Sequence, residues 1–233
     1  MGQKTHPKAF RLVSTQPHLS SWYAEKKKYS VFLQEDFQIR ELIMKELEKI
    51  LEISSIQIER LGNKVNLLLT VFYPRQTTLK TRVKKFFEKQ LSDPKYRKFS
   101  IKEWTSFFLK QKLRSLSQKL NKLSENIYFI SLKFIKNRYL DASLIANFIS
   151  FQLADRLPFR RILKTVLTKA KKSGVKGIKI ELSGRLNGID IARSEWKRQG
   201  KIPLHTLRAF IDYSHKISKG PQGITGIKVW VYN

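Results

Sequence analysis

Segment 159–172, FRRILKTVLTKAKK, carries the residues whose types and spacing best suit binding chemistry. Arg160, Arg161 and Lys164 stand in it without any aspartate or glutamate, so no neighbour within the segment neutralises their charge. An arginine offers a planar fork that fits phosphate oxygens, and a lysine offers a compact point charge. Positions 160 and 164 are one helical turn apart, so a helix would turn both toward the same anionic backbone. The segment predicts a grip on phosphates that does not read bases.

Catalytic chemistry has much weaker support in this sequence. The chain has no cysteine, which excludes a cysteine nucleophile, thiolate zinc sites and disulfides. Asp190 and Glu195 could be proposed as paired carboxylates, but the arginines near them make a salt bridge the simpler interpretation. No Walker loop is present for binding ATP. The histidines are scattered without metal-ligand spacing, at His6, His18, His205 and His215. We expect no enzyme, no catalytic residue, no metal and no cofactor.

The whole chain is strongly basic, with 47 Lys+Arg against 18 Asp+Glu and a net charge of +29 over 233 residues. A domain this charged would repel itself, so it needs a polyanionic partner. Nucleic acid is the first candidate and an anionic membrane surface the second. No apolar run is long enough to span a bilayer, and we expect neither a membrane partner nor a small-molecule substrate. Apolar residues make up 41%, which is enough to form a core.

Hydrophobic periodicity predicts the elements that position these cations. Asp36 is the expected N-cap of the first helix, and Gly174 is the expected cap after the basic helix. The expected helices cover 37–51, a long stretch beginning after Ser100, 141–153 and 159–172, and the expected strands cover 53–59, 65–73, 127–134, 177–183, 207–213 and 227–232, with a turn at 61–64.

A basic insert is predicted over 74–126. The helix after Ser100 has an apolar stripe, made of Ile101, Trp104, Phe108, Leu116, Leu120 and Leu123. Two interpretations of the insert stay open. It is either an extension that contacts RNA or a neighbouring protein, or a pair of helices that packs on its own domain.

Three separated segments resemble one protein family. They are 183–212 (SGRLNGIDIARSEWKRQGKIPLHTLRAFID), 1–12 (MGQKTHPKAFRL) and 223–232 (GITGIKVWVY), in the right order along the chain. The sequence resembles the small-subunit ribosomal protein numbered three, a universal family with a KH domain, in its bacterial and plastid type.

The resemblance implies an α+β fold with a degenerate type II KH domain, a helical insertion, and a small α+β C-terminal domain. The expected parts are a basic N-terminal arm over 1–36, a KH-like domain over 37–153 with the insert at about 74–126, and the C-terminal domain over 154–233. A KH domain holds RNA with a Gly-x-x-Gly loop. Segment 73–90 has no glycine, so the usual clamp is absent. Side-chain contacts could replace it with less specificity, from Arg75, Lys80, Arg82, Lys84 and Lys85.

The resemblance also assigns roles to single cations. Arg160, Arg161 and Lys164 match the residues that line the entrance of the mRNA channel and help to separate duplexes. The alternative for this helix is a generic basic surface facing ribosomal RNA. The further residues expected to bind rRNA are Lys4, Lys8, Arg11, Lys169, Lys171, Lys172, Arg185, Arg193, Arg198 and Arg208.

The expected function is that of a structural constituent of the small ribosomal subunit head, which binds rRNA, mRNA and neighbouring head proteins. Lysine outnumbers arginine, a bias typical of an AT-rich genome, so we expect a plastid ribosome and synthesis in the compartment where the chain works. The alternatives are a free organellar RNA-binding protein or RNA chaperone and, with less support, a DNA-repair lyase or nuclease side activity.

Overall fold

The computed structural model describes residues 4–12, 14–47, 51–72, 101–124, 126–221 and 223–233, with the side chains of the helix that begins at Ile101 described from Leu109 onward. The chain forms two compact units. Leu19–Ile135 is called the central unit here, and Met1–His18 together with Lys136–Asn233 is called the C-terminal unit. The arm expected over 1–36 is therefore shared between them.

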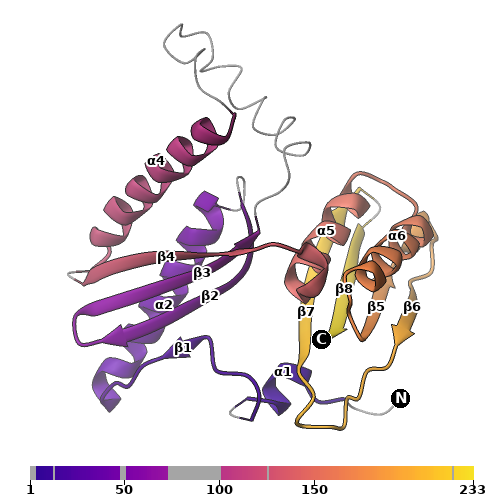
Figure 1. Ribbon diagram of the computed structural model, residues 1–233, viewed down its shortest axis with the longest axis horizontal. Helices are drawn as coiled ribbons and strands as arrows, with labels where there is room; N and C mark the ends of the chain where they lie inside the picture. The colour runs from indigo at the N-terminus through magenta and orange to yellow at the C-terminus, as the bar shows by residue number, and fades with distance from the viewer. Residues whose placement is uncertain (1–3, 13, 48–50, 73–100, 125, 222) are drawn as a thin grey trace, which may run out of the picture. The chain divides into compact units, whose positions relative to one another are not determined.

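The central unit is built from helices packed on a sheet (Figure 1). Its described elements are β1 (Ser20–Ser21), α2 (Lys26–Leu47), β2 (Glu52–Leu61), β3 (Lys64–Phe72), α4 (Ile101–Asn121) and β4 (Ile127–Ile135). The strands pair in the order β1-β2-β3-β4, with β2 antiparallel to β3 and β3 parallel to β4. A tight turn at Gly62, with φ of 58°, joins β2 to β3 as predicted. Parallel pairing requires a crossover between β3 and β4, and α4 lies within it.

The core of the central unit includes the described part of α4. Leu116 and Leu120 of α4 are buried with Ile43 of α2 and with the inward side of β3, which alternates from Val65 to Val71. Leu116 and Leu120 of the predicted stripe therefore pack on their own unit, which agrees with the second interpretation of the insert for these two residues. Residues 73–100, the replacement cations among them, and the side chains of Ile101, Trp104 and Phe108 lie outside the described residues, and Leu123 is exposed.

Asp36 is not an N-cap, because α2 begins ten residues earlier, at Lys26. It lies buried in the middle of the helix, where its Oδ1 is 2.6 Å from Nη2 of Arg60 on β2. Its Oδ2 accepts a hydrogen bond of 2.8 Å from the indole N–H of Trp22. Burial lowers the pKa of Arg60, but hydrogen bonds to Glu35 and Asp36 outweigh it, so this pKa is raised overall. The carboxylate thus fastens α2 to the sheet.

The C-terminal unit places two helices on one face of an antiparallel sheet (Figure 1). Its described elements are α1 (Pro7–Phe10), η2 (Arg138–Leu140), α5 (Ala142–Ala154), α6 (Phe159–Lys172), β5 (Gly177–Gly184), η3 (Leu186–Gly188), β6 (Arg193–Gly200), β7 (Ile211–Gly220) and β8 (Gly223–Tyr232). The strand order is β6-β5-β8-β7. Helix α5 packs on β7 and β8, and α6 packs on β5 and β6. The α+β class predicted from the sequence is confirmed.

Helix α5 belongs to the C-terminal unit, which differs from the boundary expected after Leu153. Ile145 and Ile149 are buried in the same core as α6 and β5. The backbone N–H of Ala142 donates a 2.6 Å hydrogen bond to Asp212 of β7, and Ser218 of β7 donates one to the carbonyl of Ser150. The units divide between Ile135 and Lys136 instead. The helix's apolar face alone did not reveal which sheet it would cover.

Two strands of the C-terminal unit also differ from expectation. β6 is not among the expected strands, since RSEWKRQG has no apolar alternation. It is an exposed edge strand that pairs only with β5 in the described sheet. β7 begins at Ile211 and not at 207, and it extends to Gly220. Its buried residues include Ser214 and Ser218, and Ser218 bonds to α5, so the strand lacks a regular apolar alternation.

Candidate nucleic-acid interface

Helix α6 spans the predicted segment, from Phe159 to Lys172. Its inward residues are buried, at Phe159, Ile162, Leu163, Val166 and Ala170. Gly174 follows the helix with φ of +84°, the left-handed conformation of a helix-ending glycine, as predicted. The helix is therefore fixed on the sheet by one stripe, and the rest of its surface faces outward.

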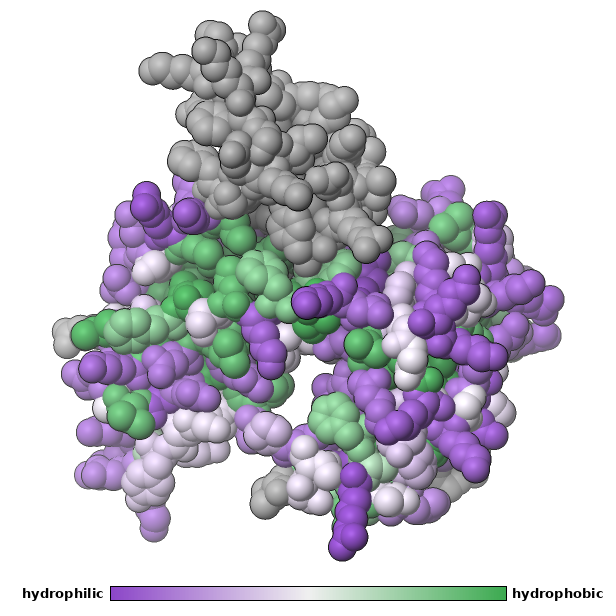
Figure 2. Space-filling model, in the orientation of Figure 1, coloured by the Kyte–Doolittle hydropathy of each residue, from purple (hydrophilic) through white to green (hydrophobic). Residues whose placement is uncertain are grey.

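The outward surface of α6 is basic. Arg160, Arg161 and Lys164 are exposed, and Lys171 and Lys172 are exposed in the last turn. Among the described residues, no carboxylate lies within salt-bridge distance of these five cations. Figure 2 shows hydrophilic side chains, in purple, gathered over the part of the C-terminal unit where α6 lies. These charges remain available to an external anion.

Lys169 differs from the other cations of the helix, because it lies against α5. Its ammonium is 5.7 Å from the ring centroid of Tyr139 and 5.9 Å from that of Phe148. Arg160 is nine residues away, which places it about 180° around a helix that turns about 100° per residue. Arg160 and its neighbour one turn on, Lys164, therefore lie on the flank that faces β6, the edge strand of the sheet.

Strand β6 adds cations to that flank. Its residues alternate between the two faces of the sheet, and the register pairs Lys197 with the buried Ile180 and Arg193 with Gly184. Lys197 and Arg193 therefore lie on the α6 side of the sheet, with Glu195 between them. Arg198 and Trp196 lie on the opposite face. We call Arg160, Lys164, Arg193 and Lys197 the α6–β6 surface.

Arg11, expected as an rRNA contact, is instead a buried structural residue with 1% of its surface exposed. Its Nε donates to the carbonyl of Ala209 at 2.9 Å, and its Nη2 donates to that of Leu204 at 2.8 Å. Further hydrogen bonds reach the carbonyls of Pro7, Pro203 and Thr206. Burial lowers the pKa of this guanidinium. An arginine with its donors engaged inside the fold is not open to RNA.

Other predicted rRNA contacts are distributed around the unit. Lys8 pairs with Asp212 at 2.8 Å and is partly buried, whereas Lys4 and Arg208 are exposed. Arg185 is exposed and bonds to Asp190 at 3.0 Å, so this carboxylate is in the expected salt bridge. The structure does not bring the ten predicted cations into one patch. The described residues also contain no cluster of three or more histidine, aspartate or glutamate side chains suited to a metal ion.

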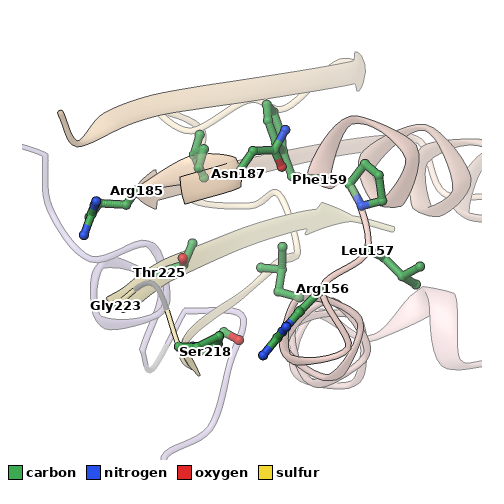
Figure 3. A pocket seen from close by; sticks show the side chains of 13 residues that line it. Arg156, Leu157, Phe159, Arg185, Asn187, Ser218, Gly223 and Thr225 are labelled. Carbon is green, nitrogen blue, oxygen red and sulfur yellow. The ribbon is translucent and has the colours of Figure 1, made fainter. Parts of the chain in front are cut away.

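A cavity of about 300 Å³ lies beside the start of α6. Figure 3 shows Leu157 and Phe159 on its helical side, and Arg185 and Asn187 on the loop after β5. Arg156 also lines it. Arg156 and Asn187 are the non-glycine residues with positive φ in the described chain, at 58° and 56°. Such backbone is uncommon outside glycine; Arg156 lies in the connection between α5 and α6, and Asn187 lies in η3.

Comparison with known proteins gives consistent matches along the chain. The family "Ribosomal protein S3, C-terminal domain" matches residues 149–231. The "Small ribosomal subunit protein uS3c" of Guillardia theta is 42% identical over 233 residues, which cover 100% of this chain and 95% of that protein. The protein of that name from Cyanophora paradoxa is 39% identical, with 100% and 94% covered. "Small ribosomal subunit protein uS3" of Synechocystis sp. (strain ATCC 27184 / PCC 6803 / Kazusa) is 39% identical, with 100% and 85% covered. None of the helices among the described residues is long and apolar enough to cross a membrane.

Proposed function

This chain belongs to the small ribosomal subunit protein uS3 family, and from that premise we propose that its α6 lines the entrance through which mRNA reaches the subunit. The family consists of ribosomal structural proteins, so the chain is a constituent of the small subunit, is associated with rRNA, and is not an enzyme. The position in the subunit head and the contact with mRNA are the parts that we propose.

The observation that carries the proposal is the uncompensated charge of a rigidly seated helix. Arg160, Arg161 and Lys164 are exposed, and α6 itself has no acid. A moving message must be held without regard to its bases, and phosphate contacts provide that kind of grip. Because the helix is packed along its whole buried stripe, its cations keep their spacing while the RNA passes.

Duplex separation follows from the same geometry without any nucleotide hydrolysis by this chain. When the ribosome translocates, a duplex at the entrance opens by thermal fraying, and cations that bind one strand's phosphates disfavour its closing. Arg160 and Lys164 lie on one flank, and Arg161 is about 100° further round the helix. This arrangement would let the helix hold two strands apart.

The remaining exposed cations of the C-terminal unit are proposed to bind rRNA. This set comprises Lys4, Lys171, Lys172, Arg193, Arg198 and Arg208, together with Arg185 and Lys169, which also contact other side chains of the unit. Arg11 is left out because it is buried, and Lys8 contributes less because it pairs with Asp212. The central unit is proposed to be a type II KH domain, supported by its element order α2-β2-β3, then α4 and β4. Relatives from cyanobacteria and plastids favour a plastid ribosome.

The test compares translation by subunits that carry Arg160→Ala, Arg161→Ala and Lys164→Ala with translation by wild-type subunits. We expect slower elongation through a stable mRNA hairpin and nearly unchanged elongation on an unstructured message. A matched control removes the same charge from Lys26, Lys27 and Lys28, which are exposed at the start of α2. Equal slowing on both messages, or equal slowing by the control, would refute the entrance role.

Sedimentation of an extract through a high-salt sucrose gradient separates the subunit role from that of a free RNA chaperone. A subunit constituent migrates with the small subunit in stoichiometric amount. A chain released into the top fractions would favour the free RNA-binding protein.

A further inference from the structure

The sheet of the C-terminal unit has a second face, away from α5 and α6, which we call the outer face. Strand alternation puts Trp196 and Arg198 of β6 on it, together with Lys179 and Glu181 of β5. On the neighbouring strand, Lys228 and Trp230 follow in register. On β8 this face is covered, because Trp230 is 8% exposed and packs with Ala209 and Ile211, against which Ile202 and Leu204 of the segment before β7 also pack. The β6 end is open.

Trp196 is an exposed aromatic side chain in a rigid position. It is 59% exposed, yet its strand is paired with β5 along all eight of its residues. The ammonium of Lys179 is 5.3 Å from the centroid of the Trp196 ring and 4.8 Å from that of Trp230. A cation against a ring is attracted to its face. The indole is thus supported from within the sheet, while more than half of its surface meets solvent.

Cations border this open ring. Arg198 is exposed one ladder step from Trp196 on the same face, and the side chain of Lys228 is 43% exposed. Glu181 lies between, 3.7 Å from Lys179 and 3.9 Å from Lys228, so two lysines share its charge. The exposed surroundings of the ring therefore keep a positive excess, and charge complementarity points to an anionic occupant.

We propose that Trp196 is a stacking platform for an unpaired nucleotide of single-stranded RNA, with Arg198 and Lys228 binding the flanking phosphates. Every base has a π-face, so stacking on an aromatic ring suits any unpaired base, and flanking cations hold the backbone. A duplex keeps its bases stacked internally and offers none to the ring. The inference builds on the chain's role in RNA binding, but it concerns the face opposite the α6–β6 surface.

The test uses the purified full-length chain and two labelled probes, an unstructured oligouridylate and a blunt RNA duplex of equal length. Trp196→Ala should weaken binding of the single strand by about 5- to 150-fold and leave the duplex affinity unchanged. Trp196→Phe keeps an aromatic face and should retain most of the affinity. Arg198→Gln should lower the slope of log affinity against log salt by about 0.7 for the single strand.

Controls distinguish this platform from other causes. Ile224→Ala removes another exposed apolar side chain from the same sheet, 62% exposed, and should change neither affinity. The variant lacking Arg160, Arg161 and Lys164 should weaken both probes, so a failure of the α6 proposal looks different. The platform is refuted if Trp196→Ala binds the single strand like wild type, or if Trp196→Phe loses as much affinity. Loss of association with another subunit protein, with single-strand binding intact, would assign the ring to a protein contact and also overturn the proposal.

Discussion

Replacing Arg11 tests whether a cation near the N-terminus acts inside the fold or on RNA. The guanidinium joins residues that are almost two hundred positions apart, since it bonds to carbonyls of Leu204 and Ala209. Arg11→Lys keeps the charge but removes the planar fork, so one ammonium cannot reach the same set of carbonyls. We therefore expect the lysine variant to be destabilised almost as much as Arg11→Met.

The magnitude can be worked from the two shortest of these bonds, at 2.8 and 2.9 Å. Hydrogen bonds to a charged group contribute about 1.5 kcal/mol or more each. Their loss alone lowers the free energy of unfolding of the C-terminal unit by about 3 kcal/mol. The longer bonds to Pro7, Pro203 and Thr206 add to this value, but not in proportion, because all of them share one side chain.

Tryptophan fluorescence during urea unfolding measures this loss within the unit itself. Trp230 packs with Ala209, whose carbonyl Arg11 binds, and Trp22 and Trp104 can be replaced by Phe to silence the rest of the chain. Arg208→Lys, at an exposed position, is the matched control and should stay within about 0.5 kcal/mol of wild type. The reasoning is refuted if Arg11→Lys unfolds at the wild-type urea concentration, or if it remains stable but loses RNA affinity.

Two further predictions concern the central unit. Leu120→Ala should lower its free energy of unfolding by about 2–5 kcal/mol, because truncating this fully buried side chain of α4 leaves a cavity. Leu123→Ala, at an exposed position, is the control and should cost little. Equal effects of the two substitutions in urea unfolding would contradict the assigned packing. A hydrogen bond from Lys119 lowers the pKa of Glu46 in the folded protein. The ionised carboxylate therefore stabilises the fold at pH values above its unfolded pKa, near 4.5, and this contribution disappears as the pH falls through the lower pKa of the folded state. Glu46→Gln should therefore be less stable than wild type at pH 7 and should approach it in acid, and a difference that does not depend on pH would show that this ion pair is not responsible.

The periodicity of apolar residues predicted the helices and strands that bury one regular face. Helix α6 has the predicted bounds, and β3 and β4 lie within a residue of theirs, because each buries a regular face. The beginning of α2 escaped prediction, since its first turns expose apolar residues such as Val31 and Leu33 and so show no amphipathic stripe. Strand β6 escaped prediction because an edge strand whose side chains are mostly exposed needs no apolar alternation.

The candidate site was predicted in part for the same physical reason. The exposed, acid-free cations of α6 were predicted because the absence of acids is a property of the local sequence; their binding role stays a proposal. The burial of Arg11 and the pairing of Asp36 with Arg60 depend on contacts between distant parts of the chain, which a single sequence does not display. Trp196 was passed over because its exposure became visible only once β6 was placed at the edge of a sheet.

The positions of the acids, more than the number of bases, decide which surfaces of the C-terminal unit can meet RNA. Asp212 accepts from Lys8 and from the first N–H of α5, and Asp141 caps that helix. Glu181 is shared by lysines of the sheet, and Asp190 is bound by Arg185. Each of these four carboxylates is held by a group away from α6 and does not neutralise the helix, whereas Glu195 of β6 lies on the α6 side of the sheet. A chain with the same net charge but an acid at Thr168, on the outward side of α6, is expected to keep the fold and to lose much of the proposed phosphate binding, since like charges repel the RNA backbone.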